Sequence, residues 1–157
     1  MATPVVAQRD DSKAYWMLNG LYEVRVSGDE TDGAMTVMEM TLPAGMGPPP
    51  HIHPGAETVY VAEGSIKYHI DGKTFDGNPG SVFHIPAGTV ENFEPTSTVR
   101  LVVTYTPGGI DKFFAEAGEP AQSRTVPPPS DTPPDFERFK AIGARHGIEM
   151  LPFPGGS

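Results

Sequence analysis

Two histidines and a nearby glutamate are the residues of this sequence whose types and spacing most favour metal chemistry. His51 and His53 are separated by one residue, and Glu57 follows four residues later. In an extended segment, residues two apart point to the same side about 6.6 Å apart, so both imidazoles can reach one ion. Glu57 has the same parity, and Pro54-Gly55 is expected to turn the chain so that the carboxylate returns to that point. Two imidazoles and one carboxylate on one face form a facial triad, which leaves positions open for water, dioxygen or substrate.

The choice of metal ligands is narrow, because the sequence contains no cysteine and therefore has neither a disulfide framework nor a thiolate donor. Imidazole and carboxylate are then the only strong donors. A short H-x-H motif is weak evidence by itself, since two exposed histidines in a loop would give the same pattern. The prediction of a metal site therefore depends on the elements around these residues.

Short β-rich segments separated by glycine and proline occupy the first two thirds of the chain. The 18 Gly and 18 Pro separate segments that recur about every 8–12 residues, which favours a sandwich or closed barrel over a βαβ fold. In residues 34–42 the even-numbered positions share one face, as the period of a strand requires. Asp71-Gly72 suits a type I′ hairpin turn. The predicted fold class is all-β, with strands at residues 22–27, 34–42, 58–63, 65–70, 73–75, 81–85 and 98–105.

Helical patterns occur only after these strands. Residues 110–118 carry an apolar stripe at helical spacing, and residues 135–147 form a second pattern that follows a Thr-Pro-Pro-Asp start and ends at Gly147. Residues 120–134 are too proline-rich for a regular element and are expected to form an extended strap. The length of 157 residues suits one domain. The expected parts are an N-terminal arm (1–20), the barrel (21–107), and C-terminal helices with the strap packed on the barrel (108–157).

Composition argues against several classes of partner. The net charge of -9 disfavours nucleic acids and anionic membranes, which need a concentrated basic surface. No window approaches the ~18 consecutive apolar residues of a membrane helix, and the first residues lack the basic start and apolar region of a secretory signal. We therefore expect a soluble, cytoplasmic protein that binds neither nucleic acid nor membrane.

Two motifs carry a family resemblance that covers about residues 22–106. Residues 45–64 read G-x5-H-x-H-x3-E-x6-G, which resembles, without a gap, the first signature of the cupin superfamily. Residues 80–95 resemble its second signature, G-x5-P-x-G-x2-H-x3-N, at the two glycines and the proline. This sequence departs from the second signature at two places. Glu91 stands where the family has its fourth ligand histidine, and Pro95 stands where it has asparagine.

The resemblance implies a cupin-type jelly-roll β-barrel with one or two C-terminal helices. Residues 27–53 and 107–120 look most like the single-domain quercetin 2,3-dioxygenase-like branch, which implies a divalent Fe, Mn, Ni or Co ion, with Zn as a further candidate. It also implies a homodimer and a small organic substrate of aromatic, flavonoid-like or polyketide-like type. By the same resemblance, the metal ligands are His51, His53, Glu57 and Glu91.

The glutamate at position 91 leaves three roles open. As a ligand, it would give the site two anionic donors, which offset a divalent charge and favour Fe or Mn over copper. Just outside the coordination sphere, it would act as a base whose pKa is raised by burial. On an exposed turn beside Glu94, it would contribute only to solubility. His84 is considered as a substitute donor but is expected to be structural. An apolar cavity wall is expected from Met38, Met40, Met46, Tyr60, Phe83, Phe93 and Tyr105.

Three functions are compatible with these residues. The first is a metal-dependent, dioxygenase-like oxidoreductase in which Glu57, or Glu91 if it is not a ligand, removes a proton from the substrate. The second uses the same ion as a Lewis acid in an isomerase, cyclase or lyase. The third is a small-molecule-binding cupin without catalysis, which the fold alone does not exclude.

Overall fold

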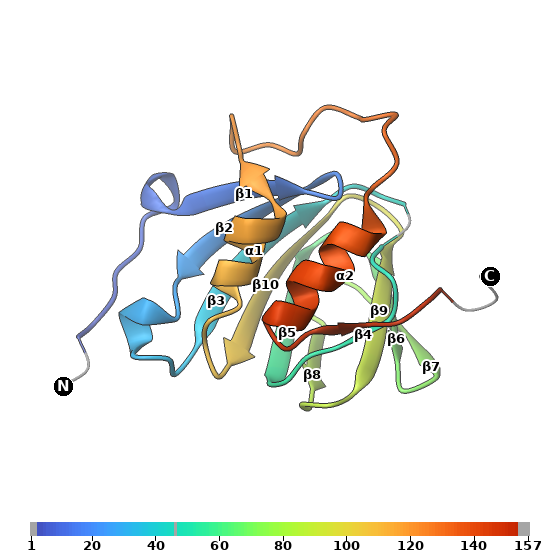
Figure 1. The fold of residues 1–157 in the computed structure, drawn as a ribbon, viewed down its shortest axis with the longest axis horizontal. Coiled ribbons are helices and arrows are strands. Elements are labelled where there is room, and N and C mark those ends of the chain that lie inside the picture. Colours follow the sequence, from blue (N-terminus) through green and yellow to red (C-terminus); the bar gives the residue numbers. More distant parts are fainter. Residues whose placement is uncertain (1–2, 46, 154–157) are drawn as a thin grey trace.

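The computed structural model describes residues 3–45 and 47–153. In these residues the chain forms short strands, two α-helices and two 3-10 helices at Arg9–Asp11 and Asp29–Thr31 (Figure 1). The helices are α1 (Asp111–Ala117) and α2 (Phe136–Arg145). The strands are β1 (Lys13–Met17), β2 (Gly20–Val26), β3 (Thr36–Leu42), β4 (His51–Ile52), β5 (Ala56–Glu63), β6 (Ile66–Ile70), β7 (Lys73–Gly77), β8 (Val82–Ile85), β9 (Val90–Pro95), β10 (Val99–Thr106), β11 (Glu119–Pro120) and β12 (Glu149–Met150).

Two antiparallel sheets face each other and form a jelly roll. The larger sheet has the order β11-β1-β2-β3-β10-β5-β8, and the smaller has the order β12-β4-β9-β6-β7. Consecutive strands therefore often lie in different sheets, as in β3 to β4 and β4 to β5. The core lies between the inner faces, where Met38, Val59 and Leu101 are fully buried. The expected all-β, cupin-type jelly-roll fold is confirmed.

Local sequence signals account for several of these elements. In β3 the even-numbered residues from Thr36 to Leu42 are buried on the inner face, as their alternation predicts. Asp71 and Gly72 both have positive φ angles, of 50° and 78°, and join β6 to β7 in the predicted tight hairpin. The predicted strand ranges do not include β1, β4, β9, β11 or β12. These strands are short or contain proline, and pairing with neighbouring strands rather than local propensity defines them.

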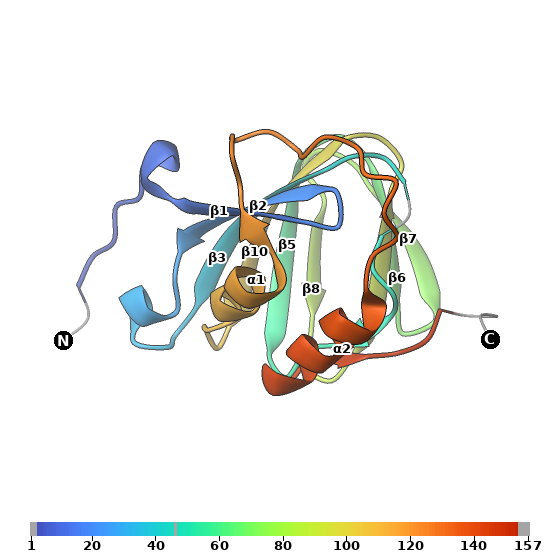
Figure 2. The same cartoon turned by 45° about the horizontal axis from the view of Figure 1, so that its top comes forward.

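Helices α1 and α2 cover the open side between the two sheets (Figures 1 and 2). The buried face of α1 contains Phe113, Phe114 and Ala117, which follow the predicted stripe. Asp135 caps α2 by accepting a hydrogen bond from the Arg138 backbone N–H at 3.0 Å, so the helix begins directly after the two prolines and this cap. Among the described residues, no helix has the length and apolar character needed to cross a membrane.

Charged contacts hold the N-terminal segment and the first part of the proline-rich segment against the outer face of the larger sheet. Glu23 is fully buried there and binds Arg9 and Arg124, each at 3.1 Å. Arg124 comes from the proline-rich segment after β11 and also donates to backbone oxygens of residues 10 and 12. Trp16 in β1 donates its indole N–H to Thr125 O at 2.8 Å. The proline-rich segment is therefore fastened along its first residues to the N-terminal part of the chain.

The glycine that ends the first motif can be tested against a glycine of similar conformation. Gly64 and Gly72 both have φ angles of +78°, but a Cβ at Gly64 would overlap the Thr98 backbone oxygen, whereas a Cβ at Gly72 would meet open space. We expect Gly72→Ala to lower the free energy of unfolding by about 1–2 kcal/mol through backbone strain alone. Gly64→Ala should cost a further ~1–3 kcal/mol from overpacking. If urea denaturation shows an equal decrease in the free energy of unfolding for the two variants, the predicted overlap at Gly64 is wrong.

Candidate metal and substrate site

The residues singled out by the two motifs meet between the sheets, although they come from separate strands. His51 in β4 lies directly opposite Glu91 in β9, because these residues are register partners in the smaller sheet. His53 follows two residues later on the same side of the chain. Glu57 enters from β5 of the larger sheet after the turn at Pro54 and Gly55. The candidate site therefore spans both sheets and requires the closed jelly roll.

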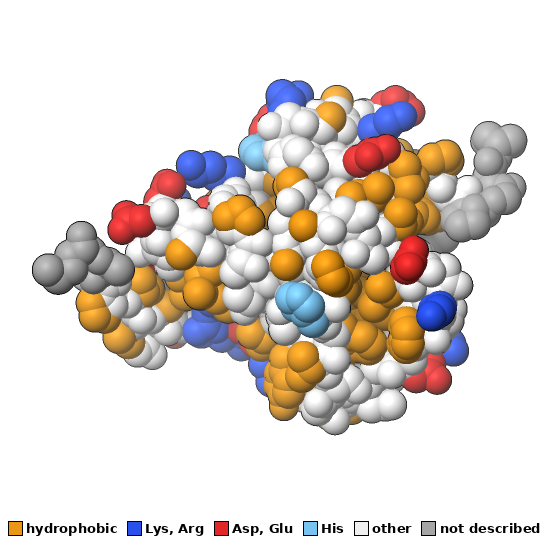
Figure 3. All heavy atoms as spheres, turned by 90° about the horizontal axis from the view of Figure 1, so that it is seen from below, with side chains coloured by type: hydrophobic (Ala, Val, Ile, Leu, Met, Phe, Trp, Pro, Cys, Tyr) orange, Lys and Arg blue, Asp and Glu red, His pale blue; other side chains and the backbone are white. Residues whose placement is uncertain are grey.

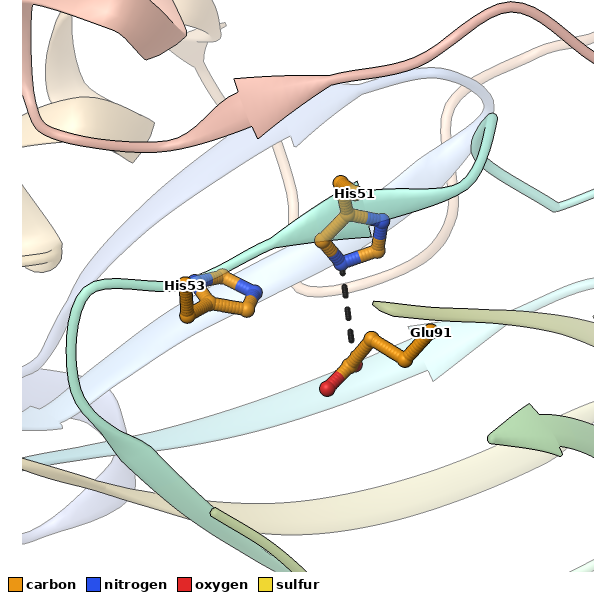
Figure 4. Close-up of side chains that lie close together, drawn as sticks. All are labelled: His51, His53 and Glu91. Atoms are coloured by element: carbon orange, nitrogen blue, oxygen red, sulfur yellow. Dashed lines mark ion pairs between the residues drawn. The ribbon is translucent and has the colours of Figure 1, made fainter. Parts of the chain in front are cut away.

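The side chains of His51, His53 and Glu91 point toward one common volume (Figure 4). One ligand atom from each of the three lies within 4.8 Å of the others. His51 Nε2 is 3.6 Å from Glu91 Oε1, and the two imidazole rings are nearly perpendicular, with centroids 4.9 Å apart. Octahedral ligands about 2.1 Å from an ion are separated by roughly 3.0–4.2 Å, so a shift of several tenths of an ångström would bring these atoms to coordination distance.

A backbone contact fixes the orientation of the first histidine. His51 Nδ1 lies 2.9 Å from Pro49 O, which accepts a hydrogen bond and thereby places the ring proton on Nδ1. The unprotonated Nε2 then faces Glu91. Burial lowers the pKa of His51, and burial also lowers the pKa of His53 to about 4, although the charge of Glu57 opposes this shift. Both imidazoles are therefore neutral near pH 7, which is the form that binds metals.

The two glutamates are buried acids with incomplete hydrogen bonding. Glu57 is 3% exposed and Glu91 is 2% exposed, so both side chains lie in the interior and Glu91 does not lie on an exposed turn. Among the described residues, Glu57 Oε2 and Glu91 Oε1 have no hydrogen-bond partner. Burial, followed by the proximity and charge of the Glu57 carboxyl group, holds the pKa of Glu91 far above its usual range. Buried oxygens without partners beside two neutral imidazoles fit a divalent cation.

Glu57 occupies a different place from the other three residues. Its Oε2 lies 3.4 Å from His53 Nε2, but Glu57 is not part of the cluster of three ligand atoms formed by His51, His53 and Glu91. The position of Glu57 on the opposite sheet explains this, because its distance from Glu91 depends on how closely the sheets approach. Glu57 is therefore adjacent to the candidate metal position from the side of the larger sheet.

The remaining histidines lie outside this cluster. His84 is exposed in β8 and interacts with Thr58 Oγ1 at 2.9 Å, so it is not a substitute donor. His69 interacts with Thr74, and His146 with Glu116.

A cavity of about 80 Å³ extends from the cluster between the sheets and the two helices. Met40, Phe93 and Tyr105 line it, as expected. Met38 and Phe83 do not line it, and Tyr60 is 47% exposed on the outer face, so its expected place in the wall is wrong. Met46 lies outside the described residues. The sequence analysis missed wall residues from the start of the barrel, β6, both helices and the C-terminal segment: Met17, Leu18, Tyr22, Tyr68, Phe113, Phe114, Phe136, Phe139, Ile148 and Met150.

Three tyrosines give this apolar wall polar groups. Tyr22, Tyr68 and Tyr105 are each at least nine-tenths buried and line the cavity. Burial raises the pKa of all three, and the charge of Glu57 raises the pKa of Tyr68 and Tyr105 further. Their hydroxyls therefore remain protonated at neutral pH and can donate hydrogen bonds to a ligand.

The buried acid pair predicts an unusual pH dependence for metal-free protein. Folded protein retains the Glu91 proton well above the unfolded pKa near 4.5, so stability falls as pH rises from that value toward the folded pKa. The lowered pKa values of the histidines act in the opposite direction only below about pH 6.5. Between pH 7 and 9, chelator-treated protein should therefore lose up to ~1.4 kcal/mol per pH unit in urea denaturation. Glu91→Gln should make the free energy of unfolding less dependent on pH in this range. An unchanged pH dependence would contradict the raised pKa of Glu91.

Comparisons with known proteins agree with this fold and motif. Residues 38–107 match the family model described as Cupin domain. Quercetin 2,3-dioxygenase of Bacillus subtilis (strain 168) is 28% identical over 128 residues, which make up 80% of this chain and 38% of that protein. The chain thus corresponds in length to well under half of this curated relative.

Two solved structures share the fold at low sequence identity. The polyketide cyclase RemF from Streptomyces resistomycificus has a TM-score of 0.57 and 24% identity, covering 66% of this chain and 80% of RemF. An RmlC-like cupin from Shewanella frigidimarina has a TM-score of 0.60 and 15% identity, covering 71% of this chain and 99% of that cupin. The domain match and the shared jelly roll show that residues 38–107 of this chain form a cupin domain, and the curated protein to which the chain is similar is a quercetin 2,3-dioxygenase.

Proposed function

We propose that this protein is a metal-dependent, dioxygenase-like cupin enzyme that acts on a small aromatic, flavonoid-like or polyketide-like substrate. The observation that carries the proposal is the convergence of two neutral imidazoles and a buried carboxylate at one end of an apolar cavity. The 28% identity to a quercetin 2,3-dioxygenase supports the oxidative assignment. That relative is much longer, and this chain covers only 38% of it.

In this proposal His51, His53 and Glu91 hold a divalent ion, and Glu57 is either a fourth ligand or the base beside it. The shared interior volume, the Nδ1 contact of His51 and the partnerless oxygen of Glu91 support the first three roles. Two carboxylates offset the charge of the ion more completely than one, which favours Fe or Mn over ions that prefer imidazole, while Ni, Co and Zn remain candidates.

The bound ion would supply Lewis acidity to a hydroxyl or enolate oxygen of the substrate. The side chains of this chain would do the remaining work. Glu57 Oε2 has no hydrogen-bond partner among the described residues and can accept the substrate proton at that atom. The tyrosine hydroxyls would orient polar groups of the substrate, and the aromatic walls would hold its rings and exclude water.

A non-oxidative cyclase, isomerase or lyase is the second candidate. The observation that favours it is the pair of buried glutamates, each beside one of the two imidazoles, since a carboxylate base next to a polarised carbonyl suffices for proton abstraction. The polyketide cyclase RemF shares the fold, although 24% identity supports no more than that likeness. A binding protein without catalysis would use the same cavity.

Metal content provides the first test of the site. We expect protein purified without chelator to carry about one divalent ion per chain, because four donors suffice for a protein-bound transition metal. Elemental analysis of the His51→Ala and His53→Ala variants should show loss of that ion. His84→Ala is the matched control and should retain it, since this histidine is exposed and interacts with Thr58 rather than with the cluster. Full occupancy in the double variant His51→Ala/His53→Ala would refute the site.

Oxygen consumption separates the oxidative and non-oxidative candidates. With quercetin as the probe, we expect uptake of about one dioxygen per substrate consumed, as a dioxygenase reaction requires. Glu57→Gln should keep the metal if Glu57 is the base and lower kcat by about 10²–10⁴-fold. Glu63→Gln is a control on the same strand, because Glu63 is exposed and pairs with Arg100. Product formed at the same rate without dioxygen would instead support the second candidate.

A further inference from the structure

A second cavity lies directly behind His53. Its wall is formed by the turn at residues 54–56, by residues 107–109 between β10 and α1, and by His146 after α2. The two cavities share His53, Tyr105, Ile110 and Ile148 in their walls. The second cavity therefore reaches one residue of the candidate metal cluster, His53, and is lined by neither His51 nor Glu91.

The first cavity has its own mouth at the other end of the barrel. There a groove lined by Leu18, Pro48 and Phe136 continues from the cavity and is bordered by Ala44 and Pro134. In Figure 1 the β1–β2 turn and the start of α2 lie toward the top, whereas the end of α2 and the start of β5 lie at the bottom. The site is therefore approached from two opposite ends, and α2 extends between them.

The two mouths differ in chemistry. Aromatic and aliphatic side chains line the upper groove, which suits rings of an organic substrate. The second cavity is lined largely by glycine, proline and alanine, with His146 at its edge. A Cβ at Gly55 would lie only 2.6 Å from Thr106 O, so the turn at this wall packs closely against the end of β10 and requires glycine.

The surface around the second cavity is uncharged in its centre. Figure 3 shows the molecule from below, where hydrophobic side chains gather in the middle and charged side chains lie mainly toward the margins. The polar group beside this opening is the contact of His146 Nε2 with Glu116 Oε2 at 2.8 Å, which Arg145 joins. This balance of charge does not favour entry of either cations or anions.

We infer that the second cavity, whose volume is about 220 Å³, is an entrance and holding site for small uncharged molecules such as water and dioxygen, which reach His53 without passing the substrate in the first cavity. Such a route would let a second reactant arrive after an organic substrate has filled the upper mouth. The use of this route in turnover depends on the proposed function, whereas the existence of the route does not.

Ala56→Phe tests the inference because Ala56 lines only the second cavity, and Ala44→Phe is the matched control because Ala44 lines only the upper groove. Metal-free protein is equilibrated with dissolved dioxygen under pressure, and the paramagnetic relaxation of the His53 ring signals is measured by NMR. We expect Ala56→Phe to reduce this relaxation at least threefold and Ala44→Phe to leave it unchanged. Ala56→Leu provides a smaller plug if the phenylalanine variant does not fold.

Manganese-loaded protein then tests the route kinetically. Exchange of water at bound Mn²⁺, followed by water-proton relaxation, should slow in Ala56→Phe and not in Ala44→Phe. Unchanged dioxygen relaxation in both Ala56 variants, or an equal effect of Ala44→Phe, would overturn the second entrance. Failure of the parent protein to bind Mn²⁺ would count against the proposed metal site instead, while the dioxygen measurement would still decide the entrance.

Discussion

Two carboxyl groups buried together in the interior require a positive charge or a proton between them. Glu57 and Glu91 enter from opposite sheets, and each has an oxygen without a partner among the described residues. Burial raises the pKa of Glu91, and the neighbouring carboxyl group of Glu57 raises it further, because charges of the same sign repel strongly where water is excluded. A divalent cation held by the neighbouring imidazoles would relieve this repulsion more completely than one shared proton. The chemistry we propose depends on this requirement for a counter-charge.

The jelly roll creates that juxtaposition through its topology. β4 and β9 bring His51 and Glu91 together as cross-strand neighbours, and the return of the chain into β5 adds Glu57 from the other sheet. Side chains from one sheet alone would form an open patch exposed to water. Closure of the two sheets, together with the helices in front of them, converts the patch into an interior site where electrostatic interactions are strong.

The sequence was sufficient for the fold and for the strand alternation around the first motif. Parity predicted that His51, His53 and Glu57 would face one region, because these residues are odd-numbered in extended chain. The same rule argues against a place for Tyr60 in the cavity wall. Tyr60 is even-numbered in β5, where the odd-numbered Glu57 points inward, and its side chain is exposed. The inward position of Glu91 came only from the family signature, since its strand β9 contains a proline and has no clear local pattern.

The cavity wall was the least predictable part. Phe136, Phe139 and Ile148 have helical or irregular spacing that marks them as apolar, but their approach to a site some 80 residues earlier depends on how the C-terminal segment packs. The composition of the sequence also does not indicate how many segments of the chain contribute residues to this wall. Residues on both sides of the proline-rich segment contact the cavity or the sheet behind it.

The burial of Glu23 has a consequence for any shortened form of the protein. Its carboxylate lies beneath Arg9 near the beginning of the chain and Arg124 far along it, so two distant segments together neutralise one interior charge. Loss of either segment would leave an acid in the sheet with half of its counterions. Both segments are thus structural parts of the domain, and a fragment that begins after Arg9 or ends before Arg124 would keep Glu23 buried without one of its two counterions.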